Sequence, residues 1–129
     1  MNEQERKDVT LAYVEALNRH DMNALSDIIT FDHKFVDLDG EVRRNRTSVM
    51  SGWEAFFRMS PTYGVHIWDI LSADDSVLLT GRATSKDNSM TRSEEFDRKL
   101  LFRSKVRGGK VAEWVVMKDT PNNRRKLRD

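Results

Sequence analysis

The feature that most restricts the fold is a change of hydrophobic period at Pro61. Before Pro61, apolar residues recur every three or four positions, as they do along one face of a helix. After it, they alternate within short runs that end at turn residues, as they do in strands. Helices followed by strands are typical of an α+β fold. We expect helices packed on one face of a curved antiparallel sheet.

Three helices are predicted before Pro61. The first spans Gln4 to about Arg19, because one face carries the apolar residues Val9, Ala12, Tyr13, Ala16 and Leu17. Asp21 has a side chain suited to an N-cap and opens a second, short helix that forms a hairpin with the first. The third covers 45–59 and ends before the proline.

Five strands are predicted. The first is Lys34 to Asp39, which places Phe35, Asp37 and Asp39 on one face. The other four form a meander over residues 65–73, 76–86, 94–107 and 110–118. Asp74-Asp75 and Gly108-Gly109 supply the tight turns.

Composition limits the class of protein. The chain has 129 residues, of which 38% are hydrophobic and 33% charged, so we expect a single domain over 1–129 with a polar end at 1–3. It has no cysteine, which excludes disulfides and thiolate sites. A net charge of +1 makes nucleic acid an unlikely partner. No secretory signal or membrane-length apolar run is found, so the cytoplasm is the expected location.

Residues 122–129 form a basic segment that contains Arg124, Arg125, Lys126 and Arg128. Its charge could contact phosphates or an acidic partner. The simpler interpretation is a frayed, solvated terminus.

The order helix, helix, strand, helix and four-stranded meander resembles the cone-shaped, cystatin-like fold of the nuclear-transport-factor-2-like superfamily. That superfamily includes ketosteroid isomerases, SnoaL-like polyketide cyclases and limonene-epoxide hydrolases. The sharpest local likeness is to the start of a ketosteroid isomerase. It lies in Tyr13-Val14-Glu15-Ala16-Leu17-Asn18, in Asp21, and in Asp37 on the first strand.

The resemblance implies catalytic roles for two residues. In ketosteroid isomerases an aspartate shuttles a proton, while a tyrosine and a protonated aspartic acid stabilise the oxyanion. Asp37 matches the base and Tyr13 the tyrosine donor, but Leu101 stands about where the family has its second acid. Asp37 could equally be a turn former before Gly40. Tyr13 could be an ordinary core residue of the first helix.

A third acid, Asp119, follows Trp114 by five residues, which resembles the end of the sheet in SnoaL-like cyclases and epoxide hydrolases. It shares strand parity with Val115 and Met117, so the carboxylate could face a pocket as an acid or base. It could also cap the turn that begins at Thr120.

Aromatic side chains could line a pocket for a flat, apolar ligand. The candidates are Trp53, Phe56, Phe57 and Trp68, with His66 as a further acid or base. Packing in the core or in a dimer interface is the alternative for each of the four aromatics. No histidines have metal-ligand spacing, and we expect neither a metal nor a cofactor.

Two functions follow from these patterns. The first is a cofactor-independent enzyme of the isomerase, cyclase or hydrolase kind, acting on a small apolar molecule with Asp37 as general base and Tyr13 as hydrogen-bond donor. The second is a noncatalytic module of the same fold that binds a small ligand or a protein. A homodimer joined through the exposed face of the sheet is compatible with either function.

Overall fold

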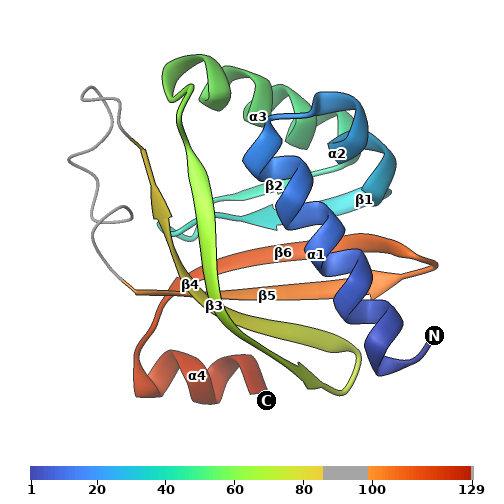
Figure 1. The fold of residues 1–129 in the computed structure, drawn as a ribbon, viewed down its shortest axis with the longest axis vertical. Coiled ribbons are helices and arrows are strands. Elements are labelled where there is room, and N and C mark those ends of the chain that lie inside the picture. The colour runs from blue at the N-terminus through green and yellow to red at the C-terminus, as the bar shows by residue number, and fades with distance from the viewer. Residues whose placement is uncertain (86–98, 129) are drawn as a thin grey trace.

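The computed structural model describes residues 1–85 and 99–128. Within them the strands form one curved sheet in the order β2-β1-β6-β5-β4-β3 (Figure 1). Neighbouring strands pair antiparallel except β1 and β6, which run parallel. The strands are β1 (Ile29–Val36), β2 (Val42–Arg44), β3 (Gly64–Ala73), β4 (Ser76–Thr84), β5 (Leu100–Arg107) and β6 (Lys110–Lys118). The α+β class and the meander of β3 to β6 are as predicted.

The three predicted helices are confirmed as α1 (Glu3–Arg19), α2 (Met22–Ile28) and α3 (Arg46–Met59). Each begins at a side chain that accepts a hydrogen bond from a free backbone N–H of the first turn. Asp21 caps α2 as predicted, with its Oδ1 3.0 Å from the Ala24 nitrogen. Asn2 and Asn45 cap α1 and α3 in the same way.

The buried face of α1 differs by one position from the predicted pattern. Tyr13, Ala16 and Leu17 are buried, but Ala12 is exposed. Thr10 is buried beside them, because its hydroxyl donates to Ser104 Oγ of β5 at 2.8 Å. A polar residue thus joins the core face where it finds a hydrogen-bond partner, which hydrophobic periodicity does not reveal.

The first strand is shifted from its predicted position of 34–39. It begins at Ile29, directly after α2, and ends at Val36. Asp37 therefore opens a turn instead of lying within the strand, and its backbone nitrogen donates to the Glu41 oxygen. The turn leads into β2, a three-residue edge strand that the sequence did not indicate.

Two devices bend the sheet. β3 carries a bulge between Ile67 and Asp69, which adds Trp68 to one side of the ladder. Gly81 of β4 lies against this bulge, and a Cβ placed there would be 2.0 Å from the His66 carbonyl oxygen. Only glycine permits this close approach of the two backbones.

The sheet has two faces with different covers. The inner face packs against α1, α2 and α3 and carries Val77, Leu79 and Phe102 of the main core. On the opposite, outer face, Leu78 and Leu101 pack against Leu127. Leu101, the position of the missing second acid, is therefore an apolar contact on the outer face.

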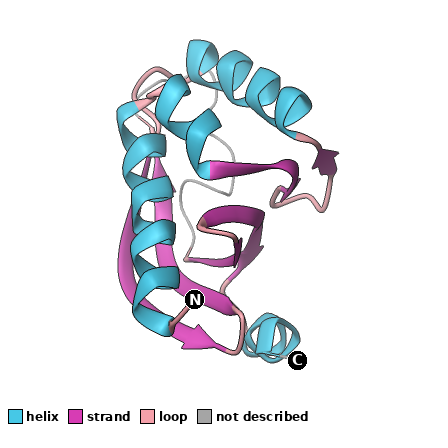
Figure 2. Cartoon of the chain, turned by 90° about the vertical axis from the view of Figure 1, so that its right-hand side faces the viewer, coloured by secondary structure: helices cyan, strands magenta, loops and turns pink. Residues whose placement is uncertain are grey.

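Leu127 belongs to a fourth helix, α4 (Pro121–Arg128), which lies apart from the other three (Figure 2). The expectation of a frayed basic terminus was wrong. Leu127, an apolar side chain among the basic ones, packs on Leu78 and Leu101, a contact with no local sequence signal. The helix covers part of the outer face of the sheet, through which the sequence analysis allows a homodimer to form.

Of the predicted strand over 94–107, the structure has β5 from Leu100 to Arg107; Lys99 lies outside the strand, and 94–98 lie outside the described residues. The turns at Asp74-Asp75 and Gly108-Gly109 are confirmed. No helix in the described ranges combines the length and the apolar character needed to cross a membrane.

Candidate functional site

A pocket of about 200 Å³ opens between α3, the β1–β2 turn and β6. Its buried part is formed by Val49, Trp53, Tyr63 and Val116. Towards solvent it is lined by Phe35, Asp37, Leu38, Gly52, Phe56 and Arg43. We call this the aromatic pocket. It has apolar walls and a few polar groups, as ligand sites generally do.

The walls are a continuous set of aromatic contacts. Trp53 lies 5.3 Å from Phe35 and 6.1 Å from Tyr63 between ring centroids. Phe56 closes the set, 4.7 Å from Tyr63 in an edge-to-face arrangement. These contacts fix the rings against each other, so a flat apolar molecule would meet a largely preformed surface.

Asp37 lies at the rim of this pocket with its carboxylate held by the turn. Its Oδ1 accepts hydrogen bonds from the backbone nitrogens of Asp39 and Glu41, at 2.9 and 3.0 Å. Asp37 thus forms the turn, one of the two alternatives that the sequence allows, and it also lines the pocket. With Oδ1 engaged by the backbone, Oδ2 is the oxygen left for a ligand.

Arg43 is the second charged residue of the pocket. It lies opposite Phe35 in the β1–β2 ladder, and directly opposed residues of a sheet share a face. Its side chain therefore extends on the same side as the aromatic wall. Asp37 and Arg43 form no ion pair with each other or with another described residue.

Tyr13 does not line the aromatic pocket. It is fully buried against Trp114, at a centroid distance of 4.8 Å, and its hydroxyl has no hydrogen-bond partner among the described residues. Burial raises the pKa of this hydroxyl, and the nearby Trp53 indole N–H, which lies outside hydrogen-bond geometry, opposes the rise to a smaller extent. The structure therefore does not bring Tyr13 and Asp37 to one cavity.

His33 fills the core next to Tyr13, 6.2 Å away between ring centroids. Burial lowers its pKa, partly offset by the Val111 carbonyl, so the ring is neutral at pH 7. Its Nδ1 donates to the Val111 oxygen at 2.7 Å. Tyr13 and His33 thus pack in the core, and neither lines the aromatic pocket.

Of the five predicted ligand-contacting residues, Trp53 and Phe56 line the aromatic pocket. Phe57 lies behind it, stacked on His20 at 3.9 Å and on Trp53 at 5.2 Å. Trp68 and His66 are exposed on β3, away from the aromatic pocket, and His66 pairs with the Thr84 hydroxyl at 3.0 Å. The structure separates these three from the pocket.

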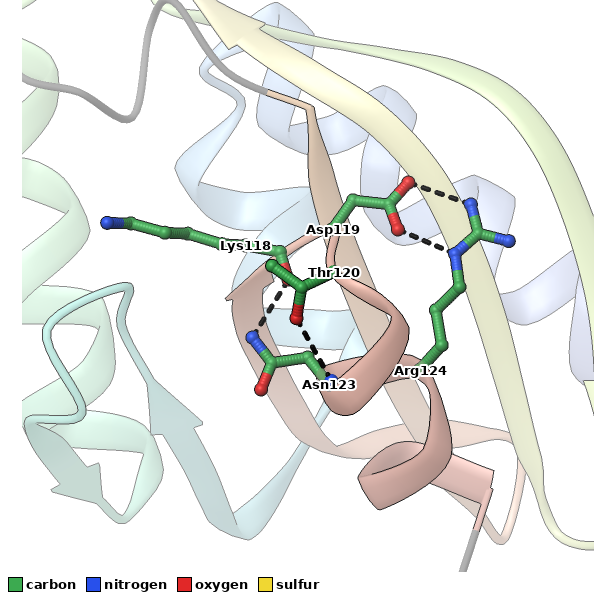
Figure 3. Close-up of polar contacts among 5 residues, drawn as sticks. All are labelled: Lys118, Asp119, Thr120, Asn123 and Arg124. Carbon is green, nitrogen blue, oxygen red and sulfur yellow. Dashed lines mark hydrogen bonds and ion pairs between the residues drawn. The ribbon is translucent and has the colours of Figure 1, made fainter.

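Asp119 lies at the end of β6 and binds the first turn of α4 (Figure 3). Its two carboxylate oxygens accept from Arg124 Nε and Nη2 at 2.6 and 2.8 Å. This pairing holds the pKa of Asp119 below its ordinary value, although partial burial opposes the shift. Thr120 caps the same helix, since its hydroxyl accepts from the Asn123 nitrogen.

This assembly is separate from the aromatic pocket. Arg124 and Leu127 border a cavity of about 70 Å³ on the outer face of the sheet, together with Leu78 and Leu101. Asp119 thus pairs with the Arg124 guanidinium on that side and does not line the aromatic pocket.

Sequence reasoning missed several residues of the pocket, chiefly Arg43, Gly52 and Tyr63. In the sequence, Arg43 is one of three nearby arginines, with Arg44 and Arg46, and such a cluster is typical of a solvated surface. The alternation of β2 would have separated Arg43 from Arg44, but a three-residue strand has too few positions to show a period. Tyr63 follows Pro61 in a connection, where periodicity carries no information.

No three His, Asp or Glu side chains are grouped to hold a metal ion in residues 1–85 and 99–128. The polar side-chain groups of the residues that line the pocket include the Asp37 carboxylate, the Arg43 guanidinium and the Tyr63 hydroxyl, set among aromatic walls. Such a set can bind a small molecule and exchange a proton with it.

The family described as SnoaL-like domain matches residues 10–114, which is most of the chain. No curated protein sequence matches the chain at a significant level. The comparison with sequences therefore identifies a family without assigning an activity.

Solved structures share the fold at low sequence identity. A protein of unknown function with a cystatin-like fold from Xanthomonas campestris has a TM-score of 0.76 at 17% identity, with 96% of this chain and 95% of that chain covered. A protein from Sinorhizobium meliloti, provisionally named a polyketide cyclase, has a TM-score of 0.72 at 16% identity, covering 90% and 99%. One from Kribbella flavida, provisionally named a ketosteroid isomerase, has a TM-score of 0.71 at 12% identity, covering 91% and 79%.

Proposed function

The chain belongs to the SnoaL-like domain family, and on that premise we propose that it is a cofactor-independent enzyme of the isomerase, cyclase or hydrolase kind. Its substrate is a small apolar molecule bound in the aromatic pocket. The observation that carries the proposal is the carboxylate of Asp37 on a pocket walled by Phe35, Trp53 and Phe56.

Asp37 is the proposed proton carrier. The backbone nitrogens of Asp39 and Glu41 fix its carboxylate through Oδ1. Its Oδ2 takes a proton from a carbon next to a carbonyl group of the substrate and returns it to the same or another carbon. The net change is a shift of hydrogen and double bond, which needs no oxidant or cofactor. A positioned base of this kind contributes roughly 10²- to 10⁴-fold to the rate.

The substrate is small. The pocket volume of about 200 Å³ is below the roughly 300–1,000 Å³ of sites for drug-sized ligands. A single six-membered ring with a few substituents is a reasonable size for it. Among molecules of that class, cyclic ketones carry the acidic C–H bonds on which a carboxylate base can act.

The roles of Tyr13 and Asp119 in this proposal differ from those that the resemblance implies. Tyr13 supports the pocket from behind, through its contacts in the core, and Asp119 holds α4 in place. Phe57, His66 and Trp68 make no contact with the substrate in this proposal.

The test is proton exchange with a small β,γ-unsaturated ketone, cyclohex-3-enone, in D₂O, followed by NMR. The protein should incorporate deuterium and move the double bond faster than buffer alone. Asp37→Asn keeps an Oδ1 for the two backbone donors, so it should fold while losing at least about 100-fold in rate. Asp39→Asn is the matched control, because it alters a carboxylate of the same turn outside the pocket and leaves the backbone donor in place.

A noncatalytic ligand-binding module is the second candidate. It is favoured by the turn around Asp37, because an acidic side chain that accepts two backbone hydrogen bonds is an ordinary turn former. A ketone that binds in the pocket without any exchange above buffer, and that raises the melting temperature of wild type and Asp37→Asn equally, would support the module and overturn the enzyme.

A further inference from the structure

Arg43 occupies a position in the aromatic pocket that its neighbours in sequence do not share. It is paired with Phe35 across the β1–β2 ladder, while Arg44 is paired with Lys34. Because successive strand residues point to opposite faces, only Arg43 of the two faces the pocket. This is consistent with the lining of the pocket, which includes Phe35 and Arg43 but not Arg44.

α3 holds the Arg43 side chain across the mouth of the pocket. The guanidinium lies on the helix at Gly52, where an added Cβ would be 3.1 Å from Arg43 Nε and 3.2 Å from Cζ. One Nη1 contact, at 3.4 Å, reaches the Ser48 carbonyl oxygen. Glycine in mid-helix is unfavourable relative to alanine, so its presence here makes room for the arginine.

The Arg43 guanidinium is left with most of its donors unused. A guanidinium has five N–H donors, and the long contact to Ser48 engages one nitrogen. Some arginines of the described residues are paired with acids, as Arg107 is with Asp32 and Arg124 with Asp119. Arg43 has no acidic partner in the part of the chain that the structure describes. Arg43 lines the aromatic pocket, whose other walls are mostly aromatic and aliphatic.

We infer that the aromatic pocket takes a small apolar molecule that carries a planar carboxylate, and that Arg43 binds this carboxylate. The inference rests on the proposed function and names the substrate class of the same site. A guanidinium matches a carboxylate with two parallel hydrogen bonds, which sets orientation as well as affinity. The apolar body of the ligand then lies against Trp53 and Phe56.

The test compares benzoate with benzamide, which has nearly the same shape and no charge. Binding is measured by titration at low salt, and the site is identified by NMR shifts of the Gly52 amide. Wild type should bind benzoate about tenfold more tightly than benzamide, the value of a charge-assisted hydrogen bond at a partly exposed site. The preference should weaken as salt is added.

One variant of Arg43 and one variant of its neighbour Arg44 form a matched pair. Arg43→Gln should bind benzoate and benzamide equally. Arg44→Gln removes the same charge from the same strand, on the face away from the pocket, and should keep the tenfold preference. Equal losses in both variants would mean that benzoate responds to the general charge of the strand, and would overturn the role of Arg43.

Gly52→Ala tests the position of the guanidinium without removing it. The new Cβ would push the Arg43 side chain by a few tenths of an ångström from its place on α3 and should reduce the preference for benzoate. Alanine suits a helix better than glycine, so the melting temperature should not fall. This separates a loss of binding from a loss of folding.

The outcomes also separate this inference from the proposed function. If wild type binds benzoate and benzamide equally at the pocket, the carboxylate assignment fails while the ligand pocket stands. If neither compound shifts the Gly52 amide at millimolar concentration, the ligand pocket fails and the inference fails with it. A tenfold preference that vanishes in Arg43→Gln and persists in Arg44→Gln supports the inference.

Discussion

The inner and outer faces of the sheet each present an aspartate and an arginine, and the two pairs differ in what satisfies them. On the outer face Asp119 and Arg124 bind each other through two hydrogen bonds. On the inner face Asp37 is held by backbone nitrogens and Arg43 by α3, and no ion pair joins them. Charges that satisfy each other hold the structure together. Charges positioned by their surroundings remain available to a ligand.

The difference has a local cause. Arg124 lies five residues after Asp119 in the first turn of a helix, so the chain returns the guanidinium to the carboxylate at the strand end. Asp37 and Arg43 flank a turn in which backbone N–H groups, and not the arginine, bind the Asp37 carboxylate. Proximity in sequence is similar for the two pairs, and the backbone between them decides the outcome.

The largest effect that should separate the two faces is a loss of stability without a loss of binding. Leu127 is 7% exposed and seats α4 on Leu78 and Leu101. Leu127→Ala should lower the free energy of unfolding by about 2 kcal/mol, the lower end for a buried leucine because the helix is terminal. Urea denaturation measures this change.

Benzoate affinity is the control for Leu127→Ala, and it should equal that of wild type. A fall in affinity together with the loss of stability would show that α4 and the aromatic pocket are coupled. The comparison between two independent faces would then be wrong.

A smaller expected change in the free energy of unfolding tests whether Tyr13 acts in the core and not in the pocket. Its hydroxyl is buried without a hydrogen-bond partner among the described residues, and such a group is costly to desolvate. Tyr13→Phe should therefore raise the free energy of unfolding by about 1 kcal/mol and leave proton exchange by Asp37 unchanged. A drop in the exchange rate of tenfold or more would instead give Tyr13 the donor role that the family resemblance implies.

The smallest expected effect is the pH dependence of the stability that Asp119 contributes on the outer face. Arg124 holds the pKa of Asp119 below the ordinary value of 3.8, so the folded state favours the carboxylate. Its contribution to stability is present above the unfolded pKa and is lost as the pH falls through the folded pKa. Asp119→Asn should thus destabilise the protein at neutral pH, and the gap to wild type should close as the pH drops below 3.8.

Urea midpoints of the two proteins across this pH range measure the gap. Asp32→Asn offers a comparison, since Arg107 likewise lowers the pKa of Asp32 but both side chains are exposed. It should show a smaller gap than Asp119→Asn, because exposed ion pairs contribute little. A gap for Asp119→Asn that stays constant with pH would remove the ion pair as the source of stability.

Much of the fold follows from the sequence alone. The helical period before Pro61, the N-cap at Asp21 and the turns at Asp74-Asp75 and Gly108-Gly109 are local signals, and the structure confirms each of them. They suffice because helix caps and tight turns depend on residues within a few positions of each other. The resemblance to the superfamily likewise depends on the order of these elements, and the family match bears it out.

The site was predictable only in part. Trp53, Phe56 and Asp37 could be named as candidates from residue type and resemblance, and they do line one pocket. Tyr13 could not be separated from the pocket by the same means. A tyrosine on the buried face of a helix has the same period whether its hydroxyl ends in a cavity or in the core.

Tertiary structure decided the rest, because the deciding contacts join distant parts of the chain. Thr10 meets Ser104 across 94 positions, and Leu127 meets Leu78 and Leu101 on the outer face. Arg43 reaches the aromatic pocket because β2 pairs with β1 and because Gly52 leaves room on α3. The sequence by itself determined α1, α2, α3 and the order in which the strands of the meander follow them, whereas β2 and α4 had no clear local signal. Which side chains meet depended on the bend and register of the sheet, since a shift of one residue moves a side chain to the opposite face.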